Sequence, residues 1–329
     1  MASIRLRAFV ESFPVAGRFT IARGSKTEAR VVRVELERDG VTGSGECVPY
    51  ARYGETVEGT LEAILAQGPA IAAGMDRAGL QAALPPGAAR NGLDCAFWDF
   101  EARGAGSDVA KLAGLEWPEG LETAFTISLD SPEAMAAAAT RSAHLPLLKL
   151  KLGAPGDAER LAAIRAAVPE TRLVVDANEG WGRDDLEGLL AACARAGVEL
   201  VEQPVPAGED EVLARIAHPV PICADESVHA LAGLEALVGR YDAVNVKLDK
   251  TGGLTEALLV VRRAEELGLS IMVGCMVSTS LAMLPAALLA PFARWVDLDG
   301  PLLLAEDRPG GLAYAKGRID VAGATLWGR

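Results

Sequence analysis

The chain has 329 residues, 50% of them hydrophobic, and a formal net charge of −13. Its length suits one large domain, or a barrel with a smaller second domain. The excess of negative charge argues against nucleic acid or an anionic membrane surface as a partner, because both would repel the protein.

Residues 1–118 are expected to form a separate α+β unit. Three strand-like runs come first, and Asp39-Gly40, a dipeptide typical of tight hairpins, separates the second from the third. Apolar residues then recur at helical spacing in three further segments. The strand-like runs are residues 4–12, 28–37 and 41–48, and the helical segments are residues 56–73, 78–84 and 87–103.

The pattern of apolar residues along the sequence changes at about residue 119. Strand-like runs alternate with helical patterns, and the strands recur every ~21–27 residues, as in a barrel of parallel strands. The eight strand-like runs are residues 124–129, 147–152, 172–178, 198–204, 221–227, 243–249, 270–276 and 294–300. The helical patterns are residues 156–168, 184–197, 231–239 and 254–268.

We therefore predict an α/β fold, with a (β/α)7β TIM-like barrel over residues 119–302. A doubly wound open sheet is the alternative, but it would normally carry a glycine-rich turn after an early strand. The sequence contains no such turn. The C-terminal segment, residues 303–329, is expected to pack back on the N-terminal unit.

Charged side chains end nearly every predicted barrel strand. In chain order they are Lys149 and Lys151, Asp176 with Asn178, Glu202, Asp225 with Glu226, Lys247, and Asp297 with Asp299. Barrel enzymes carry their chemistry at the carboxyl ends of the strands. Because polar groups are costly to bury without partners, we expect these side chains to converge on one site.

Three of the carboxylates, Asp176, Glu202 and Asp225, end adjacent strands. Carboxylate oxygens, with room left for water and substrate, suit Mg²⁺. The alternative is that each carboxylate only caps the helix that follows it, which is common for a single residue at such a position. Three in succession at matching strand ends favour the metal site.

Two lysines are placed to act as acid and base. Lys149 and Lys151 share one face of their strand, and Lys247 ends the strand that lies opposite in an eight-stranded barrel. Lys151 and Lys247 would flank a substrate, and nearby cations would lower a lysine pKa toward neutrality. Pairing with a carboxylate is the alternative, expected most for Lys149. The arrangement predicts removal and return of an α-proton through a metal-stabilised enediolate.

Asp297 and Asp299 give a clue to the substrate. They lie two residues apart and so face the same way, and an acidic pair suits an ammonium group. The alternative is that Asp299, which precedes Gly300 and Pro301, only forms a turn. We favour a substrate that carries an amine.

The motifs KLK (residues 149–151), VDAN, EQP, ADES, NVK and DLDGP together resemble the enolase superfamily, in its muconate-lactonizing subgroup, over essentially the whole chain. NVKLDKTGG and DLDGP are similar to the dipeptide epimerases of that subgroup. The resemblance implies an N-terminal capping domain, one Mg²⁺ per subunit on the three carboxylates, and inversion of the C-terminal α-carbon of a dipeptide. Lys151 and Lys247 would be the two catalysts, and Lys149 would assist them.

The resemblance also implies a substrate, a dipeptide of alanine and glutamate, and a role in the recycling of peptidoglycan peptides. Residues 18–25 occupy the position of the family's specificity loop, where Arg23 would meet the glutamate side-chain carboxylate. Other residues expected at the pocket are Tyr53, which would close over it, Thr126, and Ser278 or Thr279. Members of the family tend to form homo-oligomers.

Two other reactions would use the same lysines and metal ion: a lyase of the o-succinylbenzoate synthase type and a muconate-type cycloisomerase. Neither has an ammonium group for Asp297 and Asp299 to bind. Branches with a His–Asp dyad are disfavoured because no histidine ends the sixth or seventh strand. A non-catalytic scaffold is disfavoured because all five catalytic-type side chains are present. Five cysteines without a CxxC pair predict free thiols and a cytoplasmic enzyme.

Overall fold

The first three strands form an antiparallel sheet in the order β1-β2-β3. In the computed structural model, which describes residues 2–328, they span Arg5–Ile21 (β1), Gly24–Arg38 (β2) and Val41–Cys47 (β3). The hairpin predicted at Asp39-Gly40 is confirmed. Both residues have a positive φ, 51° and 81°, as a two-residue type I′ turn requires.

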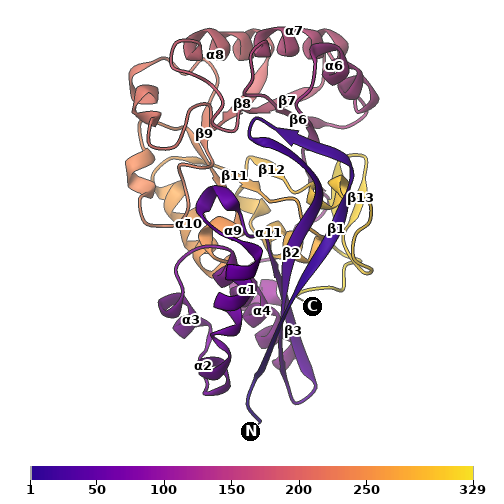
Figure 1. Ribbon diagram of the computed structural model, residues 1–329, viewed down its shortest axis with the longest axis vertical. Helices are drawn as coiled ribbons and strands as arrows, with labels where there is room; N and C mark the ends of the chain where they lie inside the picture. The colour runs from indigo at the N-terminus through magenta and orange to yellow at the C-terminus, as the bar shows by residue number, and fades with distance from the viewer. Residues whose placement is uncertain (1, 329) are drawn as a thin grey trace.

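β1 and β2 extend further than the sequence pattern indicated. Their pairing is irregular between Pro14 and Phe19 and then continues to the tip, where Ile21 lies opposite Gly24. Residues 18–25, expected in the position of a loop, are therefore the end of a β-hairpin. Gly24 has a φ of 137°, which other residues rarely adopt, and this permits the reversal. Figure 1 shows the hairpin reaching from the N-terminal domain to the barrel strands.

Five helices accompany this sheet: α1 (Val57–Leu65), α2 (Gly68–Ala72), α3 (Arg77–Ala83), α4 (Ala88–Gly104) and α5 (Val109–Ala113). α4 packs closely on β3, because β3 carries glycines at the contact. A Cβ atom added to Gly43 would lie 2.3 Å from the Phe100 nitrogen, and one added to Gly45 would lie 2.2 Å from the Gly92 oxygen. The close approach buries an apolar core between the helices and the sheet.

All eight predicted barrel strands are present. They are β5 (Phe125–Ile127), β6 (Leu147–Lys151), β7 (Arg172–Asp176), β8 (Val198–Glu202), β9 (Ile222–Ala224), β10 (Ala243–Val246), β11 (Ser270–Gly274) and β12 (Trp295–Asp297). They pair in parallel in chain order. The Ala124 amide donates to the Val296 carbonyl at 2.8 Å, so the first and last strands meet. The predicted TIM-like barrel is confirmed.

The longer helices after residue 119 are α6 (Pro132–Arg141), α7 (Asp157–Ala167), α8 (Leu186–Arg195), α10 (Leu254–Glu266) and α11 (Ser280–Ala287). Shorter elements are α9 (Leu248–Thr251) and the 3-10 turns η1 (Ala51–Tyr53), η2 (Asp210–Arg215), η3 (Leu234–Leu237), η4 (Ala290–Phe292) and η5 (Gly300–Leu303). The helix predicted at residues 231–239 is wrong in extent. Only η3 forms there, because Gly233 precedes it with φ 92° and Val238 is already extended. No helix within residues 2–328 is long and apolar enough to span a membrane.

An apolar layer fills the barrel interior on the amino-terminal side of the charged residues. Its residues are each at most 2% exposed, and they are Ala124, Leu147, Val174, Leu200, Cys223, Ala243, Met272 and Trp295. Side chains two residues apart share one face of a strand. The next inward positions toward the carboxyl ends are therefore those of the predicted site, namely Lys149, Asp176, Glu202, Asp225 and Asp297. The charged layer therefore packs directly against the apolar layer.

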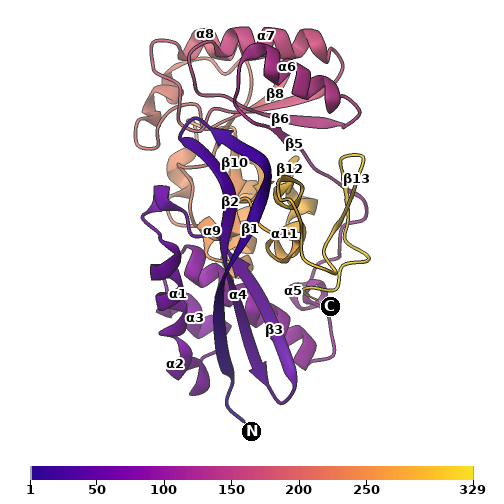
Figure 2. The same ribbon diagram turned by 45° about the vertical axis from the view of Figure 1, so that its right-hand side comes forward.

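The C-terminal segment forms a small sheet and contacts the N-terminal domain. β13 (Ala313–Ala315) pairs with β14 (Arg318–Asp320), which pairs with β4 (Leu121–Glu122). Trp327 Nε1 donates to the Cys95 carbonyl at 2.8 Å. Figure 2 shows this segment beside α5. The domain limits given above stay a prediction, and their outermost residues, 1 and 329, lie outside the described part of the chain.

Candidate active site

Lys149 lies at the centre of the charged layer. Its Nζ atom is 2.6 Å from Glu202 Oε2, 2.7 Å from Asp297 Oδ2 and 3.3 Å from Asp176 Oδ2. The lysine is 1% exposed, and these three carboxylates raise its pKa well above the ordinary value although burial alone would lower it. Lys149 is therefore a buried cation that holds three strand ends together, which fits its predicted supporting role.

Lys151 and Lys247 lie on either side of this layer, on strands separated by β7, β8 and β9. Lys151 Nζ donates to Asp176 Oδ2 at 2.6 Å. Lys247 directly follows β10, and its Nζ atom lies 2.7 Å from Asp225 Oδ2 and 3.8 Å from Glu202 Oε1. The structure thus brings both predicted catalysts and all three predicted metal ligands into one buried cluster.

The carboxylates also control the protonation of this cluster. Burial alone would lower the pKa of Lys247, but Asp225 and Glu202 raise it well above the ordinary value. The carboxylate partners bind Lys247 directly, and the lowering of a lysine pKa that is expected beside a bound metal ion stays a prediction. Conversely, burial would raise the pKa of Asp176, yet the charges of Lys151 and Lys149 lower it.

The carboxylate oxygens of this cluster are its possible donors to a divalent cation. Among residues 2–328, no three acidic, histidine or cysteine side chains are arranged to hold a metal ion as they stand, since lysine ammonium groups lie between the carboxylates. The chemistry of the donors fits Mg²⁺ nevertheless, because Asp176, Glu202 and Asp225 are at most 2% exposed and offer only oxygen. Burial and then the charge of Asp176 raise the pKa of Glu202, and a cation bound at these oxygens would offset the repulsion between the two carboxylates.

Sequence reasoning missed the residues that orient these ligands. Lys250 Nζ, 1% exposed, donates to Asp225 Oδ1 and to the Asp225 carbonyl, both at 2.6 Å, and to the Asn245 carbonyl at 2.9 Å. Asn245 Nδ2 donates to Glu202 Oε1 at 2.7 Å. The amide of Gln203 works similarly, because its Oε1 accepts from the Asp225 nitrogen at 2.9 Å. The spacing of Lys250 three residues after Lys247, one helical turn, was the available signal.

The predicted ammonium site is built from Asp297 and Asp299. Asp297 Oδ2 is bound to Lys149, and its Oδ1 has no hydrogen-bond partner within residues 2–328. Asp299 Oδ2 accepts from the backbone nitrogen of Thr126 at 2.7 Å, so Thr126 also lies at this end of the site. Burial, followed by the charge of Asp297, raises the pKa of Asp299 to about 7. A cation bound here would relieve that repulsion.

Arg23, the residue expected to meet a substrate carboxylate, already contacts protein carboxylates. Its guanidinium lies 2.6 Å from Glu226 Oε1 and 3.1 Å from Glu179 Oε2. It also donates to the Asn178 carbonyl and to the Tyr50 hydroxyl, each at 2.8 Å. Arg23 therefore fastens the hairpin tip to the ends of the barrel strands, and its substrate contact stays a prediction.

The other residues predicted at the pocket lie in different surroundings. Ser278 is fully buried, and its hydroxyl donates to the Met276 carbonyl at 2.9 Å. Thr279 instead donates to Glu46 of the N-terminal domain at 2.6 Å. The Tyr53 hydroxyl has no hydrogen-bond partner within residues 2–328, and burial raises its pKa. Among the hydrogen bonds of residues 2–328, none joins the Ser278 or Thr279 side chain to Asp176, Glu202 or Asp225.

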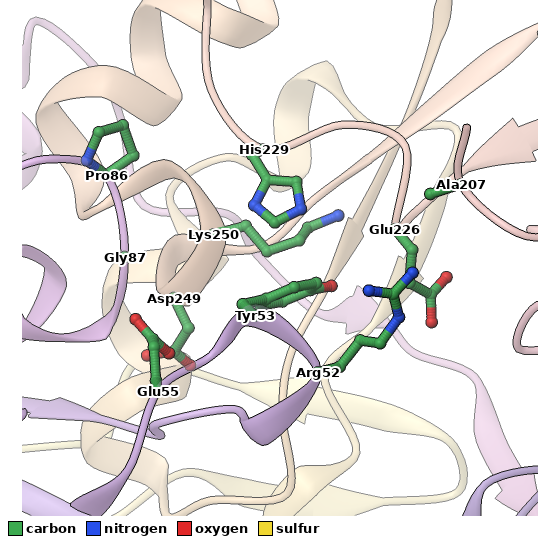
Figure 3. A pocket seen from close by; sticks show the side chains of 10 residues that line it. All are labelled: Arg52, Tyr53, Glu55, Pro86, Gly87, Ala207, Glu226, His229, Asp249 and Lys250. Carbon is green, nitrogen blue, oxygen red and sulfur yellow. The ribbon is translucent and has the colours of Figure 1, made fainter.

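Tyr53 lines a cavity of about 460 Å³ between the two domains. Figure 3 shows Tyr53 and Arg52 of the N-terminal domain beside Glu226, His229 and Lys250 of the barrel, and the Tyr53 ring packs edge-on against His229 with the ring centroids 4.3 Å apart. Glu226 follows Asp225 in the sequence, and Lys250 Nζ donates to Asp225 Oδ1. The cavity therefore adjoins the carboxylate cluster from the side of the N-terminal domain.

Comparison with known proteins agrees with this architecture. Residues 3–114 match the mandelate racemase / muconate lactonizing enzyme N-terminal domain, and residues 133–325 match the enolase C-terminal domain-like family. The L-Ala-D/L-Glu epimerase of Escherichia coli (strain K12) is 47% identical over 95% of this chain and 98% of its own. An N-acetyl-D-glutamate racemase of a Pseudoalteromonas species is 45% identical over 87% of this chain and 91% of its own.

Solved structures are similar over nearly the whole chain. An enolase family member from Agrobacterium tumefaciens with homology to dipeptide epimerases, crystallised with sodium and L-Ala-L-Glu, has a TM-score of 0.97 at 52% identity and covers 99% of this chain and 100% of its own. A dipeptide epimerase from Enterococcus faecalis V583, complexed with Mg and L-Leu-L-Tyr, has a TM-score of 0.90 at 31% identity and covers 99% and 98%.

Proposed function

Because the chain belongs to the enolase superfamily, in its mandelate racemase/muconate lactonizing enzyme family, we propose that it is a Mg²⁺-dependent dipeptide epimerase that interconverts L-Ala-L-Glu and L-Ala-D-Glu. The observation that carries this proposal is the position of Lys151 and Lys247 on either side of one carboxylate layer. Two acid/base groups, one on each face of a carbon centre, can invert that centre by removing a proton from one face and returning one to the other.

The two lysines divide the proton transfer between them. One lysine, as a neutral amine, takes the α-proton of the C-terminal residue, while the other, as an ammonium ion, delivers a proton to the opposite face. The first ends as an ammonium ion and the second as an amine, and proton exchange with solvent restores both. Asp176 and Asp225 hold the two Nζ atoms at 2.6 and 2.7 Å.

Asp176, Glu202 and Asp225 would hold the metal ion. The chemistry supplied by bound Mg²⁺ is attachment of the substrate carboxylate, uptake of the charge that develops there, and competition with the lysines for their carboxylates. Lys149, bonded to Glu202 and Asp297, keeps those strand ends in register. Lys250 keeps Asp225 in one orientation through its contacts with both the side chain and the carbonyl.

The acidic pair binds the amino end of the dipeptide. Asp297 offers its unpartnered Oδ1 and Asp299 a carboxylate beside it. The lyase and cycloisomerase alternatives would leave these charges without an ammonium partner. A dipeptide of alanine and glutamate is a fragment of peptidoglycan peptides, so the enzyme serves their recycling, and its five free cysteines suit the reducing cytoplasm.

One observation favours a second candidate, racemisation of N-acylated glutamate. Burial and the charge of Asp297 raise the pKa of Asp299 to about 7, so a large fraction of it is protonated near neutral pH and can donate to an acyl oxygen. Such a substrate has no ammonium group.

The test is proton NMR in D₂O with Mg²⁺. Loss of the glutamate α-proton signal and appearance of L-Ala-D-Glu from L-Ala-L-Glu are expected. Asp297→Asn and Asp299→Asn variants should lose most of this activity. A protein that leaves L-Ala-L-Glu unchanged but exchanges the α-proton of N-acetylglutamate would replace the first candidate by the second.

A further inference from the structure

Asp249 is a buried carboxylate of the segment NVKLDKTGG that has no part in the proton transfer described above. It is the second residue of α9, and in the sequence it lies between the proposed catalyst, Lys247, and Lys250. Asp249 Oδ1 accepts from the Val48 nitrogen at 2.9 Å and from Asn91 Nδ2 at 2.7 Å. Both donors belong to the N-terminal domain, so Asp249 joins the turn that follows β10 to the other domain.

The N-terminal domain holds the other end of α9 as well. Arg90 of α4 donates to the Thr251 carbonyl at 2.7 Å and to the Gly252 carbonyl at 3.2 Å. The packing here is close, because a Cβ atom added to Gly252 would lie 2.4 Å from Arg90 Nε. Asn91 follows Arg90 on α4, so one turn of that helix binds both ends of α9.

Lys247 depends on α9 because it lies beyond the strand pairing. β10 pairs with β11 only as far as Val246. The Lys247 carbonyl instead accepts from two backbone nitrogens of α9, each at 3.0 Å. Lys151 differs, because it is still part of β6 and is paired with β7. The backbone of Lys247 is therefore positioned by α9, whereas that of Lys151 is positioned by the sheet.

The side chains of α9 point to opposite sides. Lys247 and Lys250 are three residues apart and reach the same carboxylate, Asp225, at 2.7 and 2.6 Å. Figure 3 shows Asp249 extending toward Glu55 of the N-terminal domain, and Lys250 extending away from it. One side of α9 thus binds the carboxylate cluster, and the other side binds the N-terminal domain.

We propose that Asp249 is a positioning residue for Lys247. Its hydrogen bonds to Val48 and Asn91 fix α9, and α9 sets the distance of Lys247 Nζ from the substrate α-carbon. This inference rests on the proposed epimerase function. Because Lys151 does not depend on α9, loss of the contact acts on only one face of the α-carbon. The N-terminal domain thereby controls one of the two proton transfers.

The test follows loss of the glutamate α-proton signal in D₂O by proton NMR, starting separately from L-Ala-L-Glu and from L-Ala-D-Glu. In Asp249→Ala, we expect exchange of the epimer that Lys247→Ala no longer exchanges to fall about 10- to 100-fold, because a displacement of about 1 Å can slow a reaction that much. Exchange of the other epimer should stay close to the wild-type rate. The ratio of the two rates is the readout, because partial unfolding lowers both equally.

Asp249→Asn keeps an acceptor oxygen for both donors, so its ratio should be near that of the wild type. Asn91→Ala removes one donor and should shift the ratio in the same direction as Asp249→Ala, and it decides the outcome if Asp249→Ala does not fold. Asp94→Ala is the matched control. It removes another buried carboxylate at the domain interface, bound to Thr255 of α10, and should leave the ratio unchanged.

An unchanged ratio in both Asp249→Ala and Asn91→Ala, or the same change in Asp94→Ala, would overturn the role of Asp249 alone. So would an Asp249→Asn variant whose ratio is as far from the wild type as that of Asp249→Ala. A wild-type protein that exchanges the α-proton of neither epimer would overturn the proposed function, and this role with it.

Discussion

Lys151 and Lys247 contact different carboxylates, and this separates their roles experimentally. In Lys151→Ala one face of the α-carbon has no base, so we expect epimerisation to fall at least ~100-fold, as is typical for loss of a general base. Lys247 can still remove the α-proton from the epimer whose α-proton points toward Lys247. Exchange with deuterium should therefore persist for one epimer in Lys151→Ala and for the other epimer in Lys247→Ala, measured by proton NMR from each pure epimer.

Lys111→Ala, which changes an exposed lysine on α5, should keep full turnover and serves as the control. If both active-site variants retain exchange of the same epimer, the lysines do not act on opposite faces. If both retain full epimerisation, neither lysine is a catalyst. The two epimers tested separately thus distinguish a loss of chemistry from a loss of folding, because an unfolded variant exchanges neither.

At the scale of single residues, the sequence predicts contacts that strand geometry dictates. Side chains alternate along β6, so Lys149 and Lys151 had to share a face, and the carboxylates at neighbouring strand ends had to meet it. Gln203 accepts from the Asp225 nitrogen and has a backbone φ of 35°, and a periodic sequence pattern reveals neither feature. The pairing of Arg23 with Glu226 joins residues 203 positions apart and depends on where the hairpin tip lies.

At the scale of elements, one carboxylate joins a helix of the N-terminal domain to a helix of the barrel. Asp94 of α4 accepts from the Thr255 backbone nitrogen at 2.9 Å and from the Thr255 hydroxyl at 2.6 Å, at the first turn of α10. Burial raises the pKa of Asp94 from 3.8 to about 6. Because the folded pKa is the higher one, the folded state binds this proton more tightly. Its contribution to the free energy of unfolding is present below about pH 4 and is lost as the pH rises through 6.

We therefore expect Asp94→Asn, which stays neutral, to flatten the fall of unfolding free energy between pH 5 and pH 7.5 by about 1.4 kcal/mol, the part of the linkage for a shift of this size that lies in this pH range. Urea unfolding at several pH values would measure it. Asp76→Asn is a suitable control, because Asp76 also accepts from the first turn of a helix, α3, but is exposed. Identical slopes for the Asp94 variant and the wild type would show that Asp94 ionises normally.

The elements themselves were predictable to different degrees. The eight barrel strands appear in the expected places because each is a short apolar run bounded by polar residues and followed by a crossover. The end of the β1–β2 hairpin was not predictable in this way. Its strands contact the barrel through Arg23 and carry few buried side chains. Their sequence therefore lacks the alternation of apolar and polar residues that is typical of a half-buried strand. The segment 231–239 has helical spacing, but its glycines limit it to one turn.

At the scale of the whole molecule, ion pairs and hydrogen bonds at the site join the ends of six strands, β6 to β10 and β12. Glu202, Asp225 and Asp176 keep their mutual repulsion even with four lysines around them, and burial with the charge of Asp176 raises the pKa of Glu202. A divalent ion at this layer would bind the folded state and not the unfolded chain, since the carboxylates lie on separate βα units. The barrel should therefore gain stability from Mg²⁺.

We expect a higher melting temperature in Mg²⁺ than in EDTA. The free energy of unfolding should rise by about 2.7 kcal/mol when the Mg²⁺ concentration is 100-fold above the dissociation constant. Because bound carboxylates must be ionised, binding should release protons, and the stabilisation should shrink as the pH falls. Glu202→Gln should lose most of the Mg²⁺ effect. Glu199→Gln, on the same strand but paired with Arg172 at the surface, should retain it. An unchanged melting temperature of the wild type in both buffers would contradict the metal site while leaving the fold intact.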